Sequence, residues 1–395
     1  RLLVLRAPPR SLTFTRVLAG ILSNVASDRG YVLIIPLAGV IFHSVGRHPI
    51  AGMAAAFAGV SGGFSANLFI GTIDPLLAGL STEAAAILDP EYVVLPTANY
   101  YFMAASTVVI AAAGTWITHR VVEPRLGAYE GDVAAEPIEP IGPVERRGLR
   151  WVVVVAGVWA ALLLAGLIPE HGLLRGPGNS LLRSPVLEGF ITLLLFVAGT
   201  LGGVYGFVTG RFRSDRDLVD GMVGGLKTLA AFLVLAFFAA QFVAFFKWSR
   251  LGLLLAIEGA DLLGRMDLGL VPLLVLFVLL SGFINLFMGS ASAKWAILGP
   301  VFVPMFMLLG YSPELSQAVF RVGDSVTNII SPMMSFFALI VVYFEKYDKR
   351  AGIGTLIATM LPYSLAFFVL WTVLLVVWAL VELPLGPGAG IHYPP

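Results

Sequence analysis

The chain has 395 residues, of which 58% are hydrophobic and only 12% are charged, and its formal net charge is +1. Soluble domains carry about 25% charged residues, so this composition excludes an ordinary soluble protein and indicates a polytopic protein of the lipid bilayer. The absence of cysteine excludes disulfides, thiol catalysis and cysteine-based metal sites, and no run of basic residues points to a nucleic-acid partner.

Residues 1–118 are predicted to form a first structural repeat. Residues of about 12–46 enter the membrane, break at a polar stretch and return, as a re-entrant hairpin does. A span of about 50–76 follows and is interrupted by a second break, and a helix of about 97–117 crosses back. Such breaks cost several kcal/mol in hydrocarbon unless protein or water satisfies the freed backbone groups.

The middle of the chain combines a polar stretch with apolar segments. Residues 119–150 are rich in acids, arginine and proline and have no apolar periodicity, so we expect a cytoplasmic linker without a fold of its own. Residues 151–246 hold three apolar segments, which we expect to form scaffold helices that hold a homodimer. Residues 251–266 are short and amphipathic, as in a helix that lies in the membrane interface.

Residues 247–395 are predicted to form a second repeat. It contains a hairpin of about 268–309, a broken helix of about 314–343 and a last helix of about 353–381, before a short tail. The first residue is Arg1 rather than Met, so we expect that an N-terminal part is missing and that the spans counted here are a minimum.

The two hairpins share a pattern of residues at equal spacing. An aromatic residue is followed by proline after five positions, by glycine ten positions later and by a second proline three positions after that. The matched residues are Tyr31, Pro36, Gly46 and Pro49 in the first copy and Trp295, Pro300, Gly310 and Pro313 in the second. This match favours a duplicated unit over the alternative of two ordinary hairpins that share a membrane composition.

The basic residues indicate how the repeats cross the membrane. If both hairpins are re-entrant, most Lys and Arg residues fall in loops on one side, which is then cytoplasmic. These loops are residues 1–10, 47–48, 119–150, 211–216 and 346–350. The hairpins then open to opposite faces. The predicted fold class is therefore an all-α polytopic membrane protein with inverted-topology repeats, each with a re-entrant helical hairpin and a broken transmembrane helix.

Asparagine side chains at the breaks suggest cation sites. Carbonyl and amide oxygens of unwound backbone suit a hard cation such as Na⁺, and we expect one site per repeat. Asn24 and Asn67 form the first predicted site, and Asn285, Asp324 and Asn328 form the second. The alternative is that these asparagines only satisfy the broken backbone.

Several other polar residues are candidates for substrate contact. Helix N-termini at the hairpin tips, near Ser27 and Ser292, suit a carboxylate. Trp295 either stacks on an aromatic ligand or packs as Tyr31 does in the other copy. Asp74 lies near the outer end of its span, where interfacial solvation is the alternative.

Asp324 lies in the middle of an apolar span, which makes it a functional candidate. It is a cation ligand or a proton carrier, or else a structural partner of Arg321 one turn away. Lys294, Asp28 and Arg29 lie near the tips, where ligand contact is the less favoured reading. No zinc-protease, nucleotide-binding or serine-hydrolase motif occurs, so we expect no enzyme and no cofactor other than bound Na⁺.

Four extended segments resemble the p-aminobenzoyl-glutamate transporter (AbgT) family. They are SNVASDRGYVLIIPLAGVIF, AGVSGGFSANLFIGTIDPLLAG, SASAKWAILGPVFVPM and RVGDSVTNIISPMM. The resemblance implies a bowl-shaped homodimer with about nine membrane helices and two hairpins in each subunit. It also implies ion-coupled transport across a bacterial inner membrane, with p-aminobenzoyl-glutamate taken up or sulfonamide antimetabolites exported. The matching positions that the family pattern marks are Asp74, Asn285, Ser292, Trp295, Pro313, Arg321, Asp324 and Pro332.

The sequence thus predicts a Na⁺- or H⁺-coupled secondary transporter of a small molecule with aromatic and carboxylate groups. The residues expected to contact this substrate are Trp295, Ser292, Asp324, Arg321, Pro313, Asp74 and Ser27. A sodium-coupled dicarboxylate symporter of similar architecture is the nearest alternative. An intramembrane enzyme and a structural membrane protein are rivals from other classes.

Overall fold

The structure is a computed structural model. It describes residues 12–24, 29–131, 133, 142–169, 171–179, 184–265 and 269–393. Over these ranges the regular elements are helices, with isolated bridges between single residues in place of strands, which confirms the predicted all-α fold class. The chain divides into two compact units, residues 1–138 with 242–395 and residues 139–241, and each is described by itself.

The first unit begins with a helix pair and an interrupted helix. In order, the helices are α2 (Leu12–Ser23), α3 (Arg29–Ser44), α4 (Pro49–Phe57) with its π-helical continuation η3 (Ala58–Gly62), α5 (Ile73–Ala85) and α6 (Tyr100–Ile117). The interruption covers residues 63–72, between η3 and α5. Its glycines and serines favour a break, because glycine weakens a helix and serine competes for the backbone.

The same order of elements recurs in the C-terminal part of this unit. After α12 (Leu251–Arg265) come α13 (Leu270–Asn285), α14 (Ala291–Leu308), α15 (Pro313–Asn328), α16 (Phe337–Glu345) and α17 (Ile353–Leu380). The interruption in this copy covers residues 329–336, between α15 and α16.

The turns between hairpin and interrupted helix are alike in the two copies. Gly46 and Gly310 have φ angles of 74° and 85°, in the left-handed region that glycine adopts without strain. Three residues later, Pro49 and Pro313 each lie in the first turn of the next helix, where the missing amide hydrogen costs nothing. The proline and glycine spacing seen in the sequence therefore encodes one turn, used twice.

A second match lies where each interrupted helix crosses the first helix of its hairpin. A methyl group at Gly59 would lie 2.2 Å from the carbonyl oxygen of Val17, and one at Gly323 would lie 2.4 Å from that of Val278. Each glycine comes thirteen positions after the turn glycine of its copy. Both crossings therefore require a residue without a side chain, and the two copies share one packing geometry.

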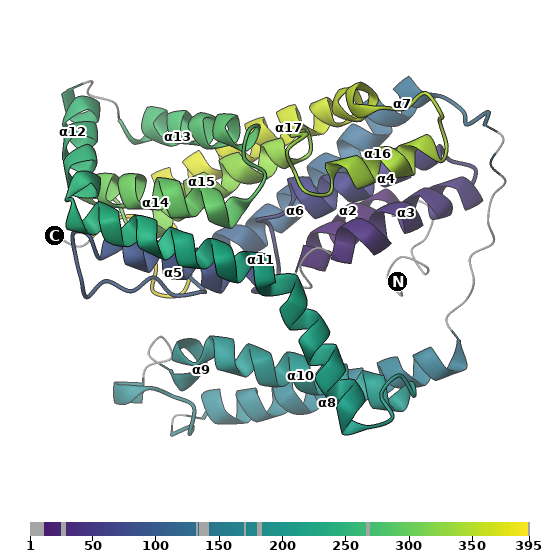
Figure 1. Cartoon of the computed structure of the whole chain (residues 1–395), viewed down its shortest axis with the longest axis horizontal. Coiled ribbons are helices and arrows are strands. Elements are labelled where there is room, and N and C mark those ends of the chain that lie inside the picture. The colour runs from purple at the N-terminus through teal and green to yellow at the C-terminus, as the bar shows by residue number, and fades with distance from the viewer. Residues whose placement is uncertain are drawn as a thin grey trace. The chain divides into compact units, whose positions relative to one another are not determined.

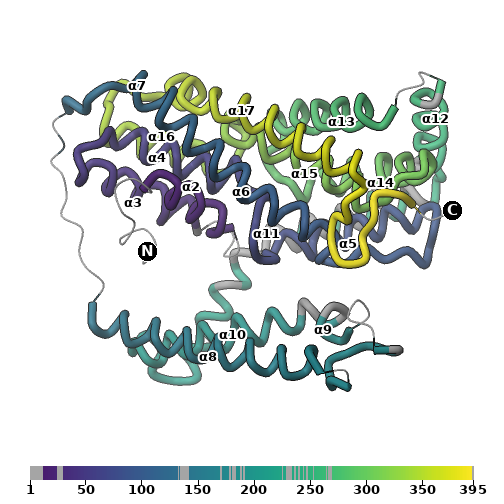
Figure 2. Tube along the Cα trace, turned by 180° about the vertical axis from the view of Figure 1, so that it is seen from behind, coloured from purple at the N-terminus to yellow at the C-terminus, as the bar shows by residue number. Residues whose placement is uncertain are grey.

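The two copies interlock rather than stand apart. Helix α14, the second hairpin helix of the second copy, packs on α5, which follows the interruption of the first copy. In the same way, α3 of the first hairpin packs on α16, which follows the interruption of the second copy. The last helices α6 and α17 pack against each other along the middle of this unit (Figures 1 and 2). Residues at the two interruptions are thereby brought into one neighbourhood.

The C-terminal tail, read from the sequence only as a short tail, is ordered against the rest of the first unit. The amide nitrogen of Ser312 donates to the carbonyl of Ile391 (2.9 Å), and that of Tyr101 donates to the carbonyl of Leu385 (2.9 Å). The tail therefore joins the turn between α14 and α15 to the start of α6.

The predicted linker is wrong at both of its ends. Helix α6 continues through η4 (Thr118–Val122) and α7 (Glu123–Leu126) and stops at Gly127, whose φ is 68°. The carboxylate of Glu123 pairs with Arg47 through two contacts of 2.7 Å, which holds this extension. On the other side, α8 already begins at Pro143, because proline suits the first helical turn.

The second unit is built from α8 (Pro143–Leu167), α9 (Pro185–Glu188) and α10 (Phe190–Val208), and α11 (Asp215–Trp248) begins in it. Helices α8 and α10 pack side by side. Large apolar side chains on both remain exposed, among them Val153, Leu162, Leu195 and Phe196. Such exposure is costly in water and expected in lipid.

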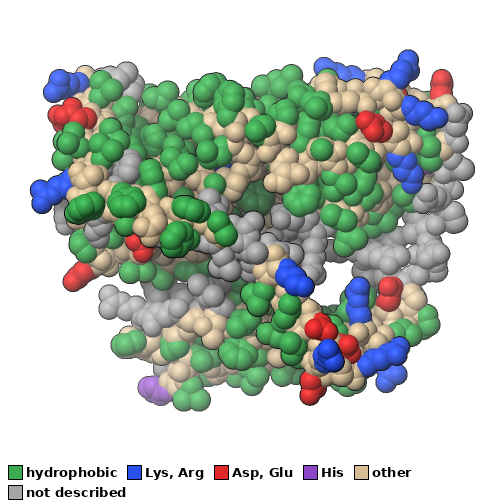
Figure 3. All heavy atoms as spheres, in the orientation of Figure 1, with side chains coloured by type: hydrophobic (Ala, Val, Ile, Leu, Met, Phe, Trp, Pro, Cys, Tyr) green, Lys and Arg blue, Asp and Glu red, His purple; other side chains and the backbone are tan. Residues whose placement is uncertain are grey.

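Four helices in the described part of the chain are long and apolar enough to cross a membrane. They are Tyr100–Leu126, Pro143–Leu167, Ala291–Leu308 and Ile353–Leu380. Helix α14 is therefore long enough to span, although the sequence predicts it as one arm of a re-entrant hairpin. Figure 3 shows hydrophobic side chains over the middle of the visible face of the first unit, with Lys, Arg, Asp and Glu toward its ends.

Candidate functional site

The candidate site lies where the hairpin of the second copy breaks beside the end of α15. Helix α13 ends at Asn285, and α14 begins after the N-cap Ser290, whose Oγ accepts from the amide of Ala293. Between them, a methyl group at Gly289 would lie 2.4 Å from the carbonyl of Met333. The break in the hairpin and the interruption after α15 are therefore in direct contact.

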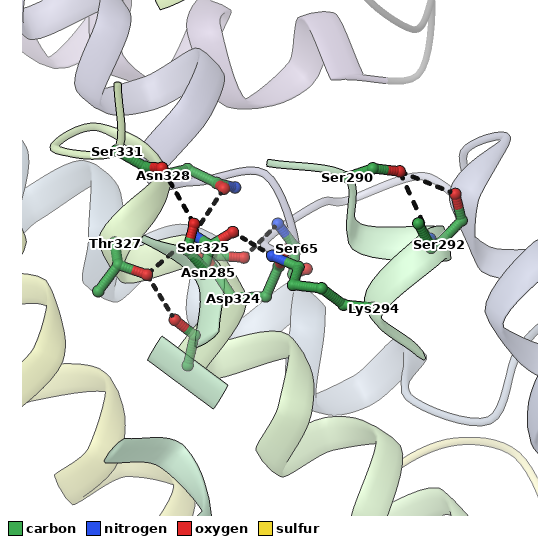
Figure 4. Close-up of polar contacts among 12 residues, drawn as sticks. Ser65, Asn285, Ser290, Ser292, Lys294, Asp324, Ser325, Thr327, Asn328 and Ser331 are labelled. Atoms are coloured by element: carbon green, nitrogen blue, oxygen red, sulfur yellow. Dashed lines mark hydrogen bonds and ion pairs between the residues drawn. The ribbon is translucent and has the colours of Figure 1, made fainter. Parts of the chain in front are cut away.

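Asn285 is the centre of a buried polar cluster (Figure 4). Its Nδ2 lies 2.8 Å from the carbonyl oxygen of Asp324, 2.8 Å from Thr327 Oγ1 and 2.9 Å from Asn328 Oδ1. The hydroxyl of Ser331 donates to the Asn285 carbonyl (3.0 Å). Three residues of the second predicted cation site, Asn285, Asp324 and Asn328, are thus brought together.

Lys294 completes this cluster. Its Nζ contacts both Asn285 Oδ1 and Asp324 Oδ1, and all three side chains are buried. The second oxygen of the carboxylate, Asp324 Oδ2, is also buried and has no hydrogen-bond partner. The cluster is therefore neutral in charge, with one carboxylate oxygen left for a further ligand.

The alternative role of Asp324, as a structural partner of Arg321, is wrong. Arg321 Nη2 lies 2.6 Å from Asp74 Oδ1, and both side chains are buried. Asp74 Oδ2 accepts from the amide of Gly71 at 2.6 Å. Asp74 belongs to the start of α5, so this ion pair joins the two copies.

Sequence reasoning named these residues but missed how they pair. The charge balance held part of a signal, because Asp74 and Asp324 are acids in apolar segments, and Lys294 and Arg321 are two of the bases there, with Arg16 of α2 a third. Buried charges are almost always paired, so each of these acids needs a base as its partner. The sequence alone does not fix which base goes with which acid.

The first copy lacks the corresponding charges. At the positions equivalent to Lys294 and Asp324 it has Gly30 and Val60, at the same spacing from the turn glycine. Near these positions, the interruption of the first copy contacts the second copy through the amide of Ser65, which donates to Ser325 Oγ at 3.2 Å.

The first predicted cation site is not assembled by hydrogen bonds. Asn24 and Asn67 are both buried, but Asn24 Nδ2 and Asn67 Oδ1 have no hydrogen-bond partner, and none of the hydrogen bonds among described residues links the two. Ser27 lies outside the described residues. A cation at this place stays a prediction.

Trp295 is buried against protein groups. Its Nε1 donates to Ser81 Oγ (2.9 Å), which in turn donates to Gln317 Oε1 (2.6 Å). The indole stacks on Phe320, with ring centroids 4.6 Å apart. Stacking of a substrate on Trp295 stays a prediction, and in this conformation Phe320 already covers one face of the indole.

The remaining predicted residues lie near the same helices. Pro313 is buried in the first turn of α15, at the turn between α14 and α15 and not at either break; substrate contact there stays a prediction. Ser292 is half-buried at the start of α14, with its Oγ 3.4 Å from that of the exposed Ser290. Of the predicted substrate contacts, this serine is the one that solvent reaches most directly in the described part of the chain.

The family model described as the AbgT putative transporter family matches residues 1–393. The chain belongs to this family. Its sequence is 41% identical over 367 residues to the p-aminobenzoyl-glutamate transport protein of Escherichia coli strain K12, a match that covers 93% of this chain and 72% of that protein.

Two solved structures share the fold of this AbgT-family chain. The YdaH transporter of Alcanivorax borkumensis, described as having an unusual topology, is 48% identical with a TM-score of 0.92, covering 98% of this chain and 81% of that one. MtrF of Neisseria gonorrhoeae, described with a class of antimetabolite efflux pumps, is 50% identical with a TM-score of 0.91, covering 98% and 78%. The protein is therefore an AbgT-family transporter, with membrane-crossing helices expected of that class.

The chemistry of the cluster suits an alkali cation better than a transition metal. Its ligand atoms are carboxylate and amide oxygens, which hard cations prefer. Among the described residues there is no group of three or more His, Cys, Asp or Glu side chains that would hold a metal ion.

Proposed function

We propose that this AbgT-family transporter moves p-aminobenzoyl-glutamate-type compounds or sulfonamide-type antimetabolites, coupled to an ion, across a bacterial inner membrane. The observation that carries the proposal is the buried cluster of Asn285, Lys294 and Asp324 at the meeting point of two helix breaks. Ionisable groups at broken helices inside a membrane are costly, and transporters place substrate and ion sites there.

The names of two relatives support the choice of substrate. The Escherichia coli relative is named for p-aminobenzoyl-glutamate, and the structure of MtrF is described with antimetabolite efflux pumps. Both kinds of compound join an aromatic amine to a polar or acidic group. The dicarboxylate symporter considered from the sequence is not favoured, because neither description mentions a plain diacid.

Sodium is the coupling ion that the cluster would accept. Asp324 Oδ2, which has no partner, would give the charged ligand, and the side-chain oxygens of Asn285 and Asn328 would give neutral ones. The cation enters here as a co-substrate, and its binding would favour the arrangement that also binds substrate.

The substrate carboxylates would meet the start of α14. Ser290 and Ser292 lie there, and the free amide groups of the first helical turn favour an anion. The aromatic ring would reach Trp295 only if Phe320 moves off the indole. We therefore expect the substrate carboxylates to bind near the two serines. We expect the aromatic ring to bind Trp295 only in a conformation in which α14 and α15 have separated.

The second unit would provide the scaffold. Its helices α8 and α10 expose apolar side chains that suit either lipid or a second copy of the chain. We propose that residues 151–246 hold a homodimer while the interlocked repeats carry the sites. Crosslinking through single introduced cysteines can test this, because these 395 residues contain no cysteine.

A liposome flux assay tests the proposed function. Purified protein is reconstituted with an imposed Na⁺ or H⁺ gradient, and uptake of labelled p-aminobenzoyl-glutamate, a sulfonamide and succinate is followed. We expect flux of one of the first two, driven by one gradient and reduced at least tenfold in Asn285→Ala. Flux of succinate alone, or gradient-driven flux unchanged in Asn285→Ala and Asn328→Ala, would contradict the proposal.

A further inference from the structure

Lys294 occupies the oxygens that a coupling cation would use. Its ammonium contacts Asn285 Oδ1 and Asp324 Oδ1, the two best ligands in the cluster, and the lysine side chain is fully buried. The ammonium is also the one basic group in contact with Asp324 among the described residues. In this conformation the protein therefore supplies its own cation to the site.

The position of Lys294 on its helix is locally unfavourable. It lies in the first turns of α14, four residues after the N-cap Ser290. The helix dipole places partial positive charge there, which stabilises anions and opposes a lysine. The attraction of the Asp324 carboxylate must outweigh this cost, because Asn285, the other partner of the ammonium, is neutral.

Charge balance prevents Na⁺ and the Lys294 ammonium from sharing the site. The ammonium already neutralises Asp324, so an added cation would leave one buried positive charge without a counterion. Two positive charges about 4–5 Å apart in a protein weaken binding by a factor on the order of 100 to 1,000. Cation binding therefore requires the ammonium to leave.

Lys294 has a flexible side chain and lies about one helical turn from the exposed Ser290. Lysine has four flexible methylene groups, which allow its charged end to move while the helix stays in place. Figure 4 shows Ser290 and Ser292 at the start of the helix that carries Lys294. Ser290 is exposed, and Ser292 is half-buried. An ammonium that leaves Asp324 can reach this edge of the site, where the proposed substrate carboxylate would lie.

We propose that Lys294 is a tethered competitor of the coupling cation. When Na⁺ binds Asp324, the ammonium moves to the start of α14 and pairs with a carboxylate of the substrate. When both leave, the ammonium returns to Asp324. Each ligand thus favours the other through one lysine, which makes the coupling reciprocal. This mechanism rests on the proposed function and names the residue that carries its coupling.

Sodium binding to the Lys294→Gln variant tests the competition. The readout is equilibrium binding of radioactive Na⁺ to the purified full-length chain, with and without p-aminobenzoyl-glutamate. Without substrate, Lys294→Gln should bind Na⁺ at least about tenfold more tightly than the wild type, because the carboxylate has lost its internal cation. Substrate should raise the Na⁺ affinity of the wild type and leave that of the variant unchanged.

Two further variants control this experiment. Lys227→Gln removes the same charge from an exposed position on α11 and should behave as the wild type. Lys294→Gln combined with Asp324→Asn leaves no unpaired charge in the cluster, so it should fold even if the single variant does not, and it should bind Na⁺ weakly.

The possible results separate the two proposals. If Lys294→Gln binds Na⁺ no more tightly than the wild type while Na⁺-driven transport persists in the wild type, the competition is wrong and the proposed function stands. If Lys294→Gln gains Na⁺ affinity but the wild type neither binds nor transports the substrate, the competition stands and the proposed function is wrong. Substrate coupling that is equal in wild type and variant would also overturn the role of Lys294.

Discussion

The ion pair between Asp74 and Arg321 makes a sharp prediction for stability. Both side chains are at least 97% buried, with Nη2 and Oδ1 2.6 Å apart. Among the described residues, Asp74 is the acid that pairs with the Arg321 guanidinium, whose Nε has no hydrogen-bond partner. Asp74→Asn would leave that charge buried and unpaired.

Removing one partner of a buried ion pair costs about 3–5 kcal/mol, whereas removing both is often close to neutral. We therefore expect Asp74→Asn and Arg321→Gln each to lower the free energy of unfolding by about 3–5 kcal/mol. The double variant should lose clearly less than the sum, with a coupling energy of about 2 kcal/mol or more. The reason is that the double variant buries no net charge.

Thermal unfolding of the purified chain in detergent measures this cycle. Asp348→Asn is the control, because its partner Arg350 is 95% exposed at 3.9 Å, and such surface pairs contribute about 0–1 kcal/mol. A midpoint for Asp74→Asn as high as that for Asp348→Asn would refute the reasoning. So would single variants whose effects simply add in the double variant.

Two further outcomes test the packing and the turn between α3 and α4. Gly323→Ala should destabilise the protein by about 1–3 kcal/mol, because its methyl group would lie 2.4 Å from the Val278 carbonyl. Gly79→Ala is the control and should be neutral or slightly stabilising, because a methyl group there would have nothing within 4 Å. Equal unfolding midpoints for the two variants would contradict this. His48 caps α4 with its Nδ1, which accepts from a backbone amide at 3.2 Å, and burial lowers the pKa of His48 below its ordinary 6.5. Because the folded state favours the neutral ring, this stabilisation is present above about pH 6.5 and is lost as the pH falls through the pKa of His48 in the folded state. Asparagine can cap a helix but does not titrate, so the unfolding midpoint of His48→Asn should depend less on pH below about pH 6.5 than that of the wild type.

The helix pairs and their interruptions were predictable from the sequence. Apolar length sets the helices, and the repeated glycine and proline spacing around Gly46 and Gly310 sets the turns, because these residues act through their own backbone. Such local rules apply without knowledge of the neighbours. The predicted fold class followed from them.

The features that sequence reasoning missed depend on contacts between distant segments. The extension of α6 depends on the pairing of Glu123 with Arg47, and the ordered tail depends on its bonds to Ser312 and Tyr101. Likewise, the partner of Asp324 is decided by which base the interlocked helices bring near. No local pattern encodes these choices, so the residues of the cluster were predictable and their pairing was not.

The difference between the two copies has a consequence for electrogenicity. Only the second copy has a carboxylate in the cluster, since Gly30 and Val60 replace Lys294 and Asp324 in the first. The Asn24 and Asn67 side chains would give such a cation neutral amide ligands, without the carboxylate that Asp324 supplies in the second copy. If the proposed ion coupling holds, this chain therefore offers one cation site with a carboxylate ligand, and the expected stoichiometry at that site is a single ion per turnover.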